Sequence, residues 1–176
     1  MRPIVYLVLL LIMVACSSPE PRHPIQRVKQ QAELTSVQIN KELLLKETEW
    51  IEQYIVAQSN LVFDKSPSGL WYAASDIQTL PYKKGTRIDF EYEVLDLNNV
   101  LIYDRKTIGR KSYFVDEQPI LYGLKEALSL LKKGASGTFL LPSILAYGVL
   151  GDQNKIGENT PLVIQLKITN IETANK

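Results

Sequence analysis

Hydrophobic residues recur at helical spacing between residues 26 and 58, a stretch with neither glycine nor proline. They lie three, four or seven positions apart, which places them on one face of an α-helix. The members of this stripe are Ile39, Leu43, Leu44, Trp50, Ile51, Tyr54 and Ile55. At ~1.5 Å per residue the helix would reach roughly 50 Å, more than one small domain can cover. Two interpretations stay open: a spacer helix packed partly on its own domain, or a helix that pairs with a second copy or another protein.

From residue 61 onward, hydrophobic residues tend to occur at every second position instead of every third or fourth. In "TRIDFEYEVLDL", Ile88, Phe90, Tyr92 and Val94 alternate with polar neighbours, which predicts a strand with one buried face. Asn98 and Asn99 suit a tight turn, after which "VLIYD" would return as the partner strand. "SYFV", "GTFLLP" and "PLVIQLKITNIE" predict further strands, the last with alternate residues 162, 164, 166 and 168 on one face.

One internal helix interrupts these strands. Pro119 is placed to start it, and Lys132, Lys133 and Gly134 supply the stop signals. The apolar face between them consists of Ile120, Leu124, Ala127, Leu128 and Leu131. The pattern predicts an α+β fold: an antiparallel sheet of five to six strands wrapped on one short helix, preceded by the long N-terminal helix.

The first fifteen residues have the layout of a secretory signal, with Arg2 followed by thirteen uncharged residues. The run is shorter than the roughly 20 apolar residues that span a bilayer. It ends in Ala15-Cys16, which resembles the bacterial lipobox, where the cysteine after a small residue receives the lipid. Cys16 is the only cysteine, so it has no internal disulfide partner; the alternative is a small core thiol. Acylation, for example with palmitate, would anchor the protein to a membrane.

The organisation we expect is a signal peptide over 1–15, a lipidated cysteine and tether over 16–25, the helix over 26–58 and a folded domain over 61–174. The tether contains three prolines and His23, the only histidine, which has no second histidine with which to share a metal. The 176 residues carry a net charge of +1, and lysine and arginine form no dense patch, so nothing points to nucleic acid.

The segment "PSILAYGVLGDQNKIG", residues 142–157, has the length of an unusually long loop, yet it is apolar. Ile144, Leu145, Tyr147, Val149, Leu150 and Ile156 account for most of this character. Either the segment folds onto a core of its own, or it keeps an apolar surface open for a ligand. Ile144, Leu145 and Val149 fit the first role better and are left out of the candidate site.

Four stretches in order resemble the FKBP-type peptidyl-prolyl isomerases: "SGLWY", "DFEYEVL" followed by "YD" at 103 and 104, "PILYGLKEAL" and "PSILAYG". The resemblance covers roughly residues 61 to 173. With the signal, tether and long helix, the whole chain is similar to the gliding-motility-associated FKBP-type lipoproteins. This resemblance implies an enzyme that rotates Xaa-Pro bonds without a cofactor or metal, since no proton or nucleophile is required.

The resemblance also implies the site. Tyr92, Asp104 and Tyr147 would be the catalytic residues: Asp104 would set the local field, and the Tyr147 hydroxyl would bind the substrate carbonyl. The Leu121 amide, just inside the helix start, would bind a flanking carbonyl. The full set of substrate-binding residues would be Tyr103, Ile120, Leu121, Leu124, Ile156 and Ile164.

The sequence departs from the family at several places. Leu124 stands where tryptophan is frequent, Ile164 where phenylalanine is, and Lys111 near a common aromatic position. The arginine that often partners the aspartate has two candidates, Arg105 and Arg110.

From the lipobox-like start and the family resemblance together, we expect a lipid-anchored isomerase of the bacterial cell envelope. It would face the periplasm or the exterior and act on proline-containing polypeptides. The alternative is a weakly active or inactive FKBP-fold scaffold lipoprotein of the envelope or motility machinery.

Overall fold

A computed structural model describes residues 26–78 and 80–173, with side chains from residue 37 onward. The predicted signal peptide, Cys16, the tether and His23 lie outside the described residues. Residues from Ile39 onward form one compact unit, and the account below concerns this unit. The described residues contain no helix that is long and apolar enough to cross a membrane.

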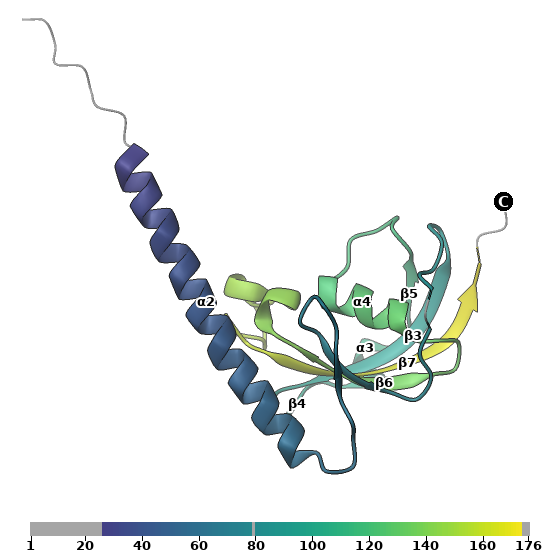
Figure 1. Cartoon of the computed structure of the whole chain (residues 1–176). Coiled ribbons are helices and arrows are strands. Elements are labelled where there is room, and N and C mark those ends of the chain that lie inside the picture. Colours follow the sequence, from purple (N-terminus) through teal and green to yellow (C-terminus); the bar gives the residue numbers. More distant parts are fainter. Residues whose placement is uncertain (1–25, 79, 174–176) are drawn as a thin grey trace, which may run out of the picture. The chain divides into compact units, whose positions relative to one another are not determined.

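The chain forms one antiparallel sheet together with a long N-terminal helix and short internal ones (Figure 1). The helices are α2 (Gln26–Ala57), α3 (Arg105–Ile108), α4 (Tyr122–Leu130), and the single 3₁₀ turns η1 (Ser143–Leu145) and η2 (Gly148–Leu150). The strands are β1 (Asp64–Lys65), β2 (Trp71–Ala74), β3 (Arg87–Leu95), β4 (Leu101–Tyr103), β5 (Lys111–Phe114), β6 (Ser136–Leu141) and β7 (Leu162–Glu172). The predicted α+β class is confirmed, and the two-residue β1 brings the sheet to seven strands.

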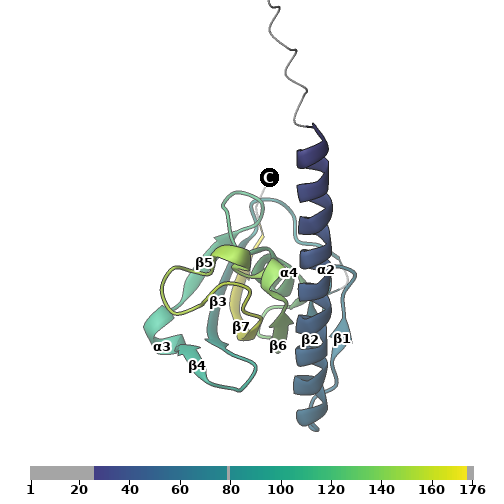
Figure 2. The same ribbon diagram turned by 90° about the vertical axis from the view of Figure 1, so that its left-hand side faces the viewer.

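The strand order is β1-β2-β6-β7-β3-β4, with β5 also paired to β3. β4 and β5 pair with opposite ends of β3: Val94 lies opposite Tyr103, and Ile88 opposite Tyr113. Figure 2 shows β1 and β2 at one end of the sheet and β4 with α3 at the other. The turn between β3 and β4 is held by Asp96, whose carboxylate accepts from the amides of Asn98 and Val100, both at 2.8 Å. Asn99 adopts the expected left-handed backbone, with φ 61°.

The main core lies between the sheet and α4. Leu124, Ala127 and Leu128 of α4 pack on the inner face of the central strands, as the helical spacing predicts. Ile164, Leu166 and Ile168 are the alternate residues of β7 on that face, and each is at most 1% exposed. Gly123 lets α4 approach closely, because a Cβ there would lie 2.5 Å from Leu141 Cδ2 and 2.9 Å from the Leu145 carbonyl oxygen.

A second core lies on the other face of the sheet, under the C-terminal half of α2. Ile51 and Tyr54 pack there against Leu95, Leu140 and Val163. The Tyr54 hydroxyl also donates to Asn99 Oδ1 at 3.0 Å. Ile51, Leu140 and Val163 are 0% exposed, and each contributes about 1.5–3 kcal/mol through burial. Residues 39–57 of α2 are therefore part of the domain.

Two sequence expectations need correction here. Trp50, Leu44 and Ile39 do not lie in the buried seam of α2, since they are 46%, 44% and 59% exposed. Helix α4 begins at Tyr122 instead of at Pro119. Leu121 is its N-cap, with an extended ψ of 135°, so the Leu121 amide lies before the helix and not inside it.

Candidate active site

Three tyrosines from separate elements meet beside the 142–157 loop. Tyr92 comes from β3, Tyr103 ends β4, and Tyr147 stands immediately before η2. All three pack against the buried side chains of Val94, Ile156 and Leu162. Burial raises the pKa of Tyr147, and the neighbouring Tyr92, Asp152 and Tyr103 raise it further. Burial also raises the pKa of Tyr92. Both phenols are therefore protonated at neutral pH and able to donate a hydrogen bond.

The apolar residues of the predicted site lie around these tyrosines. Leu124, Ile156 and Ile164 are 3%, 3% and 1% exposed. Ile120 and Leu121 are half-buried before α4 and pack on the same cluster as Leu124 and Ile164. Tyr92 touches both this cluster and the one that contains Ile156. The structure thus brings the predicted apolar and tyrosine residues into one continuous region.

Tyr103 uses its hydroxyl to hold the loop. The hydroxyl donates to Asp152 Oδ2 and accepts from Asn154 Nδ2 at 3.1 Å. The hydrogen bond to Asp152 is the main cause of a raised pKa of Tyr103. Lys155 Nζ lies 5.3 Å from the centre of the Tyr103 ring, within cation–π range. Because its hydroxyl is occupied in this way, Tyr103 can contribute to the site only through its aromatic ring.

Asp104 is the charged residue of the predicted site, and its side chain has no partner among the described residues. It precedes α3 as the N-cap, but its carboxylate makes no cap hydrogen bond. Arg105 pairs with Glu93 at 3.6 Å and Arg110 with Glu91 at 3.4 Å. Neither arginine therefore partners Asp104, whose half-buried carboxylate has no hydrogen bond or ion pair with any residue that the structure describes.

Asp152 is an organising residue that the sequence reasoning missed. Its carboxylate accepts from the backbone amides of Asn154 and Ile156 at 2.9 and 2.8 Å. Gly151, with φ 62°, precedes it, and a Cβ there would lie 2.3 Å from the Ile156 carbonyl oxygen. The dipeptide Gly151-Asp152 is a turn signal that could have indicated this arrangement. The loop thus folds around Asp152 and buries Ile156.

Glu47 is the second residue that was missed. It is 1% exposed, four positions after Leu43 and four before Ile51, on the buried stripe of α2. Its two carboxylate oxygens accept from Ser143, one from the backbone amide at 2.7 Å and one from Oγ at 2.6 Å. A carboxylate within an apolar helical stripe is the signal that could have identified it.

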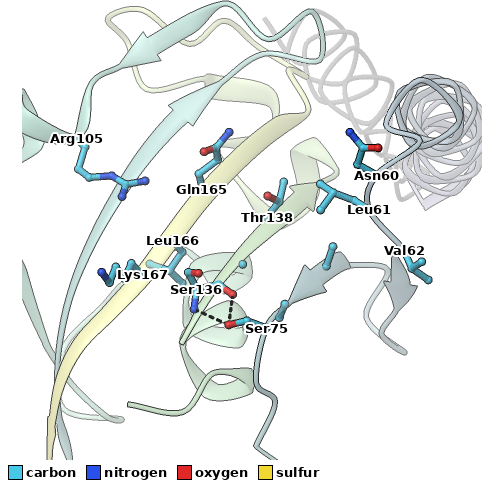
Figure 3. Close-up of a pocket in the computed structure, with 13 residues that line it drawn as sticks. Asn60, Leu61, Val62, Ser75, Arg105, Ser136, Thr138, Gln165, Leu166 and Lys167 are labelled. Atoms are coloured by element: carbon cyan, nitrogen blue, oxygen red, sulfur yellow. Dashed lines mark hydrogen bonds between the residues drawn. The ribbon is translucent and has the colours of Figure 1, made fainter. Parts of the chain in front are cut away.

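Two of the larger cavities of the domain lie on different sides of it, and one of them reaches Tyr147. One of about 590 Å³ lies between α2 and the loop, and its lining includes Leu43, Leu44, Tyr147, Val149 and Leu150. Tyr147 therefore lies between this cavity and the other tyrosines. The other cavity, of about 650 Å³, lies on the polar outer face of the sheet (Figure 3). Figure 3 shows Arg105 at one side of it and Asn60 at the other, with Gln165 and Thr138 between.

The accessible part of this region consists of the half-buried tyrosine rings, with the apolar side chains packed beneath them and the Tyr92 and Tyr147 hydroxyls as donors. In the described part of the chain, no group of three or more histidine, cysteine, aspartate or glutamate side chains is arranged to hold a metal ion. The arrangement suits binding of a neutral, partly apolar group whose carbonyl takes a hydrogen bond.

Solved structures share this architecture. FkpA from Escherichia coli superposes with a TM-score of 0.60 at 20% identity, covering 94% of this chain and 80% of that chain. A peptidyl-prolyl cis-trans isomerase from Pseudomonas syringae pv. tomato gives 0.59 at 18% identity, covering 76% of this chain and 96% of that one. The domain has the FKBP-type fold.

The chain is also similar to one protein by sequence. Over 84 residues, 48% of its length, it is 34% identical to a probable FKBP-type peptidyl-prolyl cis-trans isomerase FkpA of Neisseria meningitidis serogroup B. The match spans 30% of the length of that relative. No family model matches the chain.

Proposed function

We propose that the chain catalyses cis–trans isomerisation of Xaa-Pro bonds in polypeptides. The observation that carries this proposal is the meeting of Tyr92, Tyr103 and Tyr147 over Ile156 in an FKBP-type fold. The named relatives are peptidyl-prolyl isomerases, which supports the same reaction.

The proposed mechanism needs neither proton transfer nor a covalent intermediate. Amide resonance sets a barrier of about 18–20 kcal/mol, and rotation takes the nitrogen lone pair out of conjugation. The twisted amide is less polar than the planar one, so it loses less hydration on entering an apolar site. Binding the twisted form better than the planar form accelerates the reaction.

Each group then has a role in this proposal. Leu124, Ile156 and Ile164 receive the prolyl ring, whose three methylenes contribute about 2 kcal/mol at ~0.8 kcal/mol each. The protonated Tyr147 hydroxyl donates to the substrate carbonyl, a bond of about 0.5–1.5 kcal/mol. The unpaired carboxylate of Asp104 supplies a negative field at the rim.

Turnover of a proline tetrapeptide by the purified chain tests the proposal. Tyr147→Phe should lower kcat/KM about tenfold, since one neutral hydrogen bond is lost. Asp104→Val should lower it further. Tyr72→Phe removes a hydroxyl from β2, outside the site, and should leave kcat/KM unchanged. A wild-type chain that gives no acceleration at micromolar concentration would refute the isomerase function.

The location of this activity is a further part of the proposal. The lipobox-like Ala15-Cys16 supports a lipid-anchored protein of the cell envelope that faces the periplasm or the exterior and acts on envelope or secreted proteins. A role in gliding motility is the narrower form of this proposal. Cells fed a labelled fatty acid should label the wild-type chain and not Cys16→Ala, which should leave the membrane fraction. Equal labelling of both proteins would refute the anchor.

A second candidate function is a binding or scaffold lipoprotein that makes little use of the isomerase reaction. Exposed apolar side chains on α2 favour it: Val37, Ile39, Leu45 and Val56 are 65%, 59%, 57% and 82% exposed. A second copy of the chain or another envelope protein would cover them. This candidate takes over if the isomerase assay gives no turnover.

A further inference from the structure

The buried carboxylate of Glu47 makes an unusual connection between α2 and the loop that carries Tyr147. An ionised carboxylate is costly to bury unless hydrogen bonds or charges compensate it. Among the residues that the structure describes, no cation pairs with Glu47. Its two short hydrogen bonds both come from one residue, Ser143, which is itself 3% exposed. The position of Ser143 is therefore fixed relative to α2.

Ser143 is joined to Tyr147 by a single compact turn. The Leu145 amide donates to the Pro142 carbonyl and the Ala146 amide to the Ser143 carbonyl, both at 2.9 Å. Leu145 is 7% exposed and anchors the turn in the main core. Tyr147 follows directly, so a displacement of Ser143 would be passed to the Tyr147 side chain.

Apart from Glu47, the Asn159 amide also holds this end of the loop, because it donates to the Gly148 carbonyl at 2.8 Å directly after Tyr147. On the inner side, α4 reaches the turn at Gly123, where an added Cβ would lie 2.9 Å from the Leu145 carbonyl oxygen. On the outer side, the cavity of about 590 Å³ separates α2 from much of the loop. Ile144, Val149 and Leu150 are 71%, 63% and 73% exposed beside it. Within the described domain, Glu47 is thus the polar side chain of α2 that holds the Ser143 end of the turn, while Asn159 holds its Gly148 end.

We propose that Glu47 is a positioning residue: through Ser143 it holds the Tyr147 hydroxyl in the place where it meets the substrate carbonyl. The inference rests on the proposed isomerase function. A hydrogen bond aids the twisted state only if its donor is already in place, because ordering the donor during the reaction would offset the gain. Helix α2 is then a part of the catalytic unit as well as a cover for the sheet.

The test measures kcat and KM of the full chain with a proline tetrapeptide. Glu47→Ala should lower kcat about three- to tenfold, the range for one lost hydrogen bond, with KM nearly unchanged. In a chain that already carries Tyr147→Phe, the same change should have no further effect on kcat. Glu47→Gln should restore most of the wild-type kcat, since its amide retains an oxygen acceptor for the Ser143 amide and a donor for Oγ.

Controls separate positioning from general destabilisation. Glu49→Ala removes an exposed glutamate from the same helix and should leave kcat unchanged. Amide exchange in Glu47→Ala should accelerate over residues 143–150 and not in β7. If Glu47→Ala does not fold, Ser143→Ala removes one of the two bonds and should give a smaller fall in kcat. Two results with an active wild type would overturn the positioning role alone. One is a kcat that Glu47→Ala does not change; the other is a fall in kcat on Glu47→Ala that is equally large in the chain that carries Tyr147→Phe. An inactive wild type would refute the proposed function itself.

Discussion

Asp152 shows how one carboxylate can order a long apolar loop. Burial alone would raise its pKa, but hydrogen bonds from Tyr103 and from the amides of Ile156, Asn154 and Lys155 outweigh burial and hold the pKa below its ordinary value of 3.8. The ionised form is therefore favoured in the folded protein. Because the same carboxylate binds Tyr103 and the Ile156 amide, it connects the wall of the proposed site to the loop.

The depressed pKa predicts how the stability of the domain changes with pH. A carboxyl whose folded pKa lies below its unfolded value stabilises fully above the unfolded value, and the contribution is lost as pH falls through the folded value. Asp152→Ala should lower the free energy of unfolding at neutral pH by about 1.5–3 kcal/mol, the range for hydrogen bonds to a charged group. The difference from wild type should shrink as the pH falls below 3.8. Thermal unfolding over a pH series measures it.

The control for this prediction must account for a second aspartate. Hydrogen bonds from Ser112 lower the pKa of Asp89 despite its burial, with help from Arg87, so Asp89 loses stabilising contacts in the same acidic range. The observable is therefore the difference between wild type and Asp152→Ala. Asp64→Ala, which changes an exposed aspartate of β1, should follow the wild-type profile. A constant difference between wild type and Asp152→Ala at every pH would contradict the role of ionised Asp152.

Single residues were predictable where they continued a repeating pattern. Tyr92 lies on the alternating face of β3, so its place beside the core followed from period two. Glu47 and Asp152 do not belong to a repeating pattern of this kind. Their roles depend on Ser143 and Tyr103, which lie 96 and 49 residues away in the sequence. Such partners become visible only once the elements are placed in space. The roles of Tyr92, Asp104 and Tyr147 remain predictions that the activity measurements test.

At the scale of elements, β7 shows what periodicity captures and what it leaves out. Its alternation predicted correctly that Leu162, Ile164, Leu166 and Ile168 share the inner face. On the opposite face Val163 is fully buried as well, because α2 covers it together with Leu140. A strand pattern carries no information on which helix covers its second face.

For helices α2 and α4, the hydrophobic pattern likewise predicted that a helix exists but not its buried face or its first residue. The glycine- and proline-free stretch gave the extent of α2 closely, but its wide apolar stripe did not reveal which residues face the sheet. The buried residues Glu47, Ile51 and Tyr54 define a narrower seam than the stripe. For α4, the proline was taken as the first helical residue, whereas the extended backbone of Leu121 delays the start to Tyr122. Proline also suits an extended approach to a helix, so it marks the boundary only approximately.

On the scale of the whole domain, the order in which helical and alternating hydrophobic patterns follow one another along the chain was enough to predict the fold class. The sequence predicts strands with alternating hydrophobic and polar residues, one internal amphipathic helix and a long helix before them. Few arrangements bury these apolar faces other than a sheet wrapped on one helix. The structure adds that α4 covers one face of the sheet, and that Ile51 and Tyr54 of α2 cover the part of the other face formed by Leu95, Leu140 and Val163. The N-terminal helix is therefore expected to matter for the stability of the sheet.

Two truncations test whether α2 is an integral part of the domain. A chain that begins at residue 59 lacks Ile51 and Tyr54 and uncovers Leu140 and Val163, both 0% exposed in the domain. Each buried apolar side chain contributes about 1.5–3 kcal/mol, so this chain should unfold at a clearly lower temperature and bind an apolar dye. A chain that begins at Ile39 keeps the compact unit complete and should match the Tm of the full chain. Equal Tm values for the two truncated chains would show that the sheet does not need its second cover.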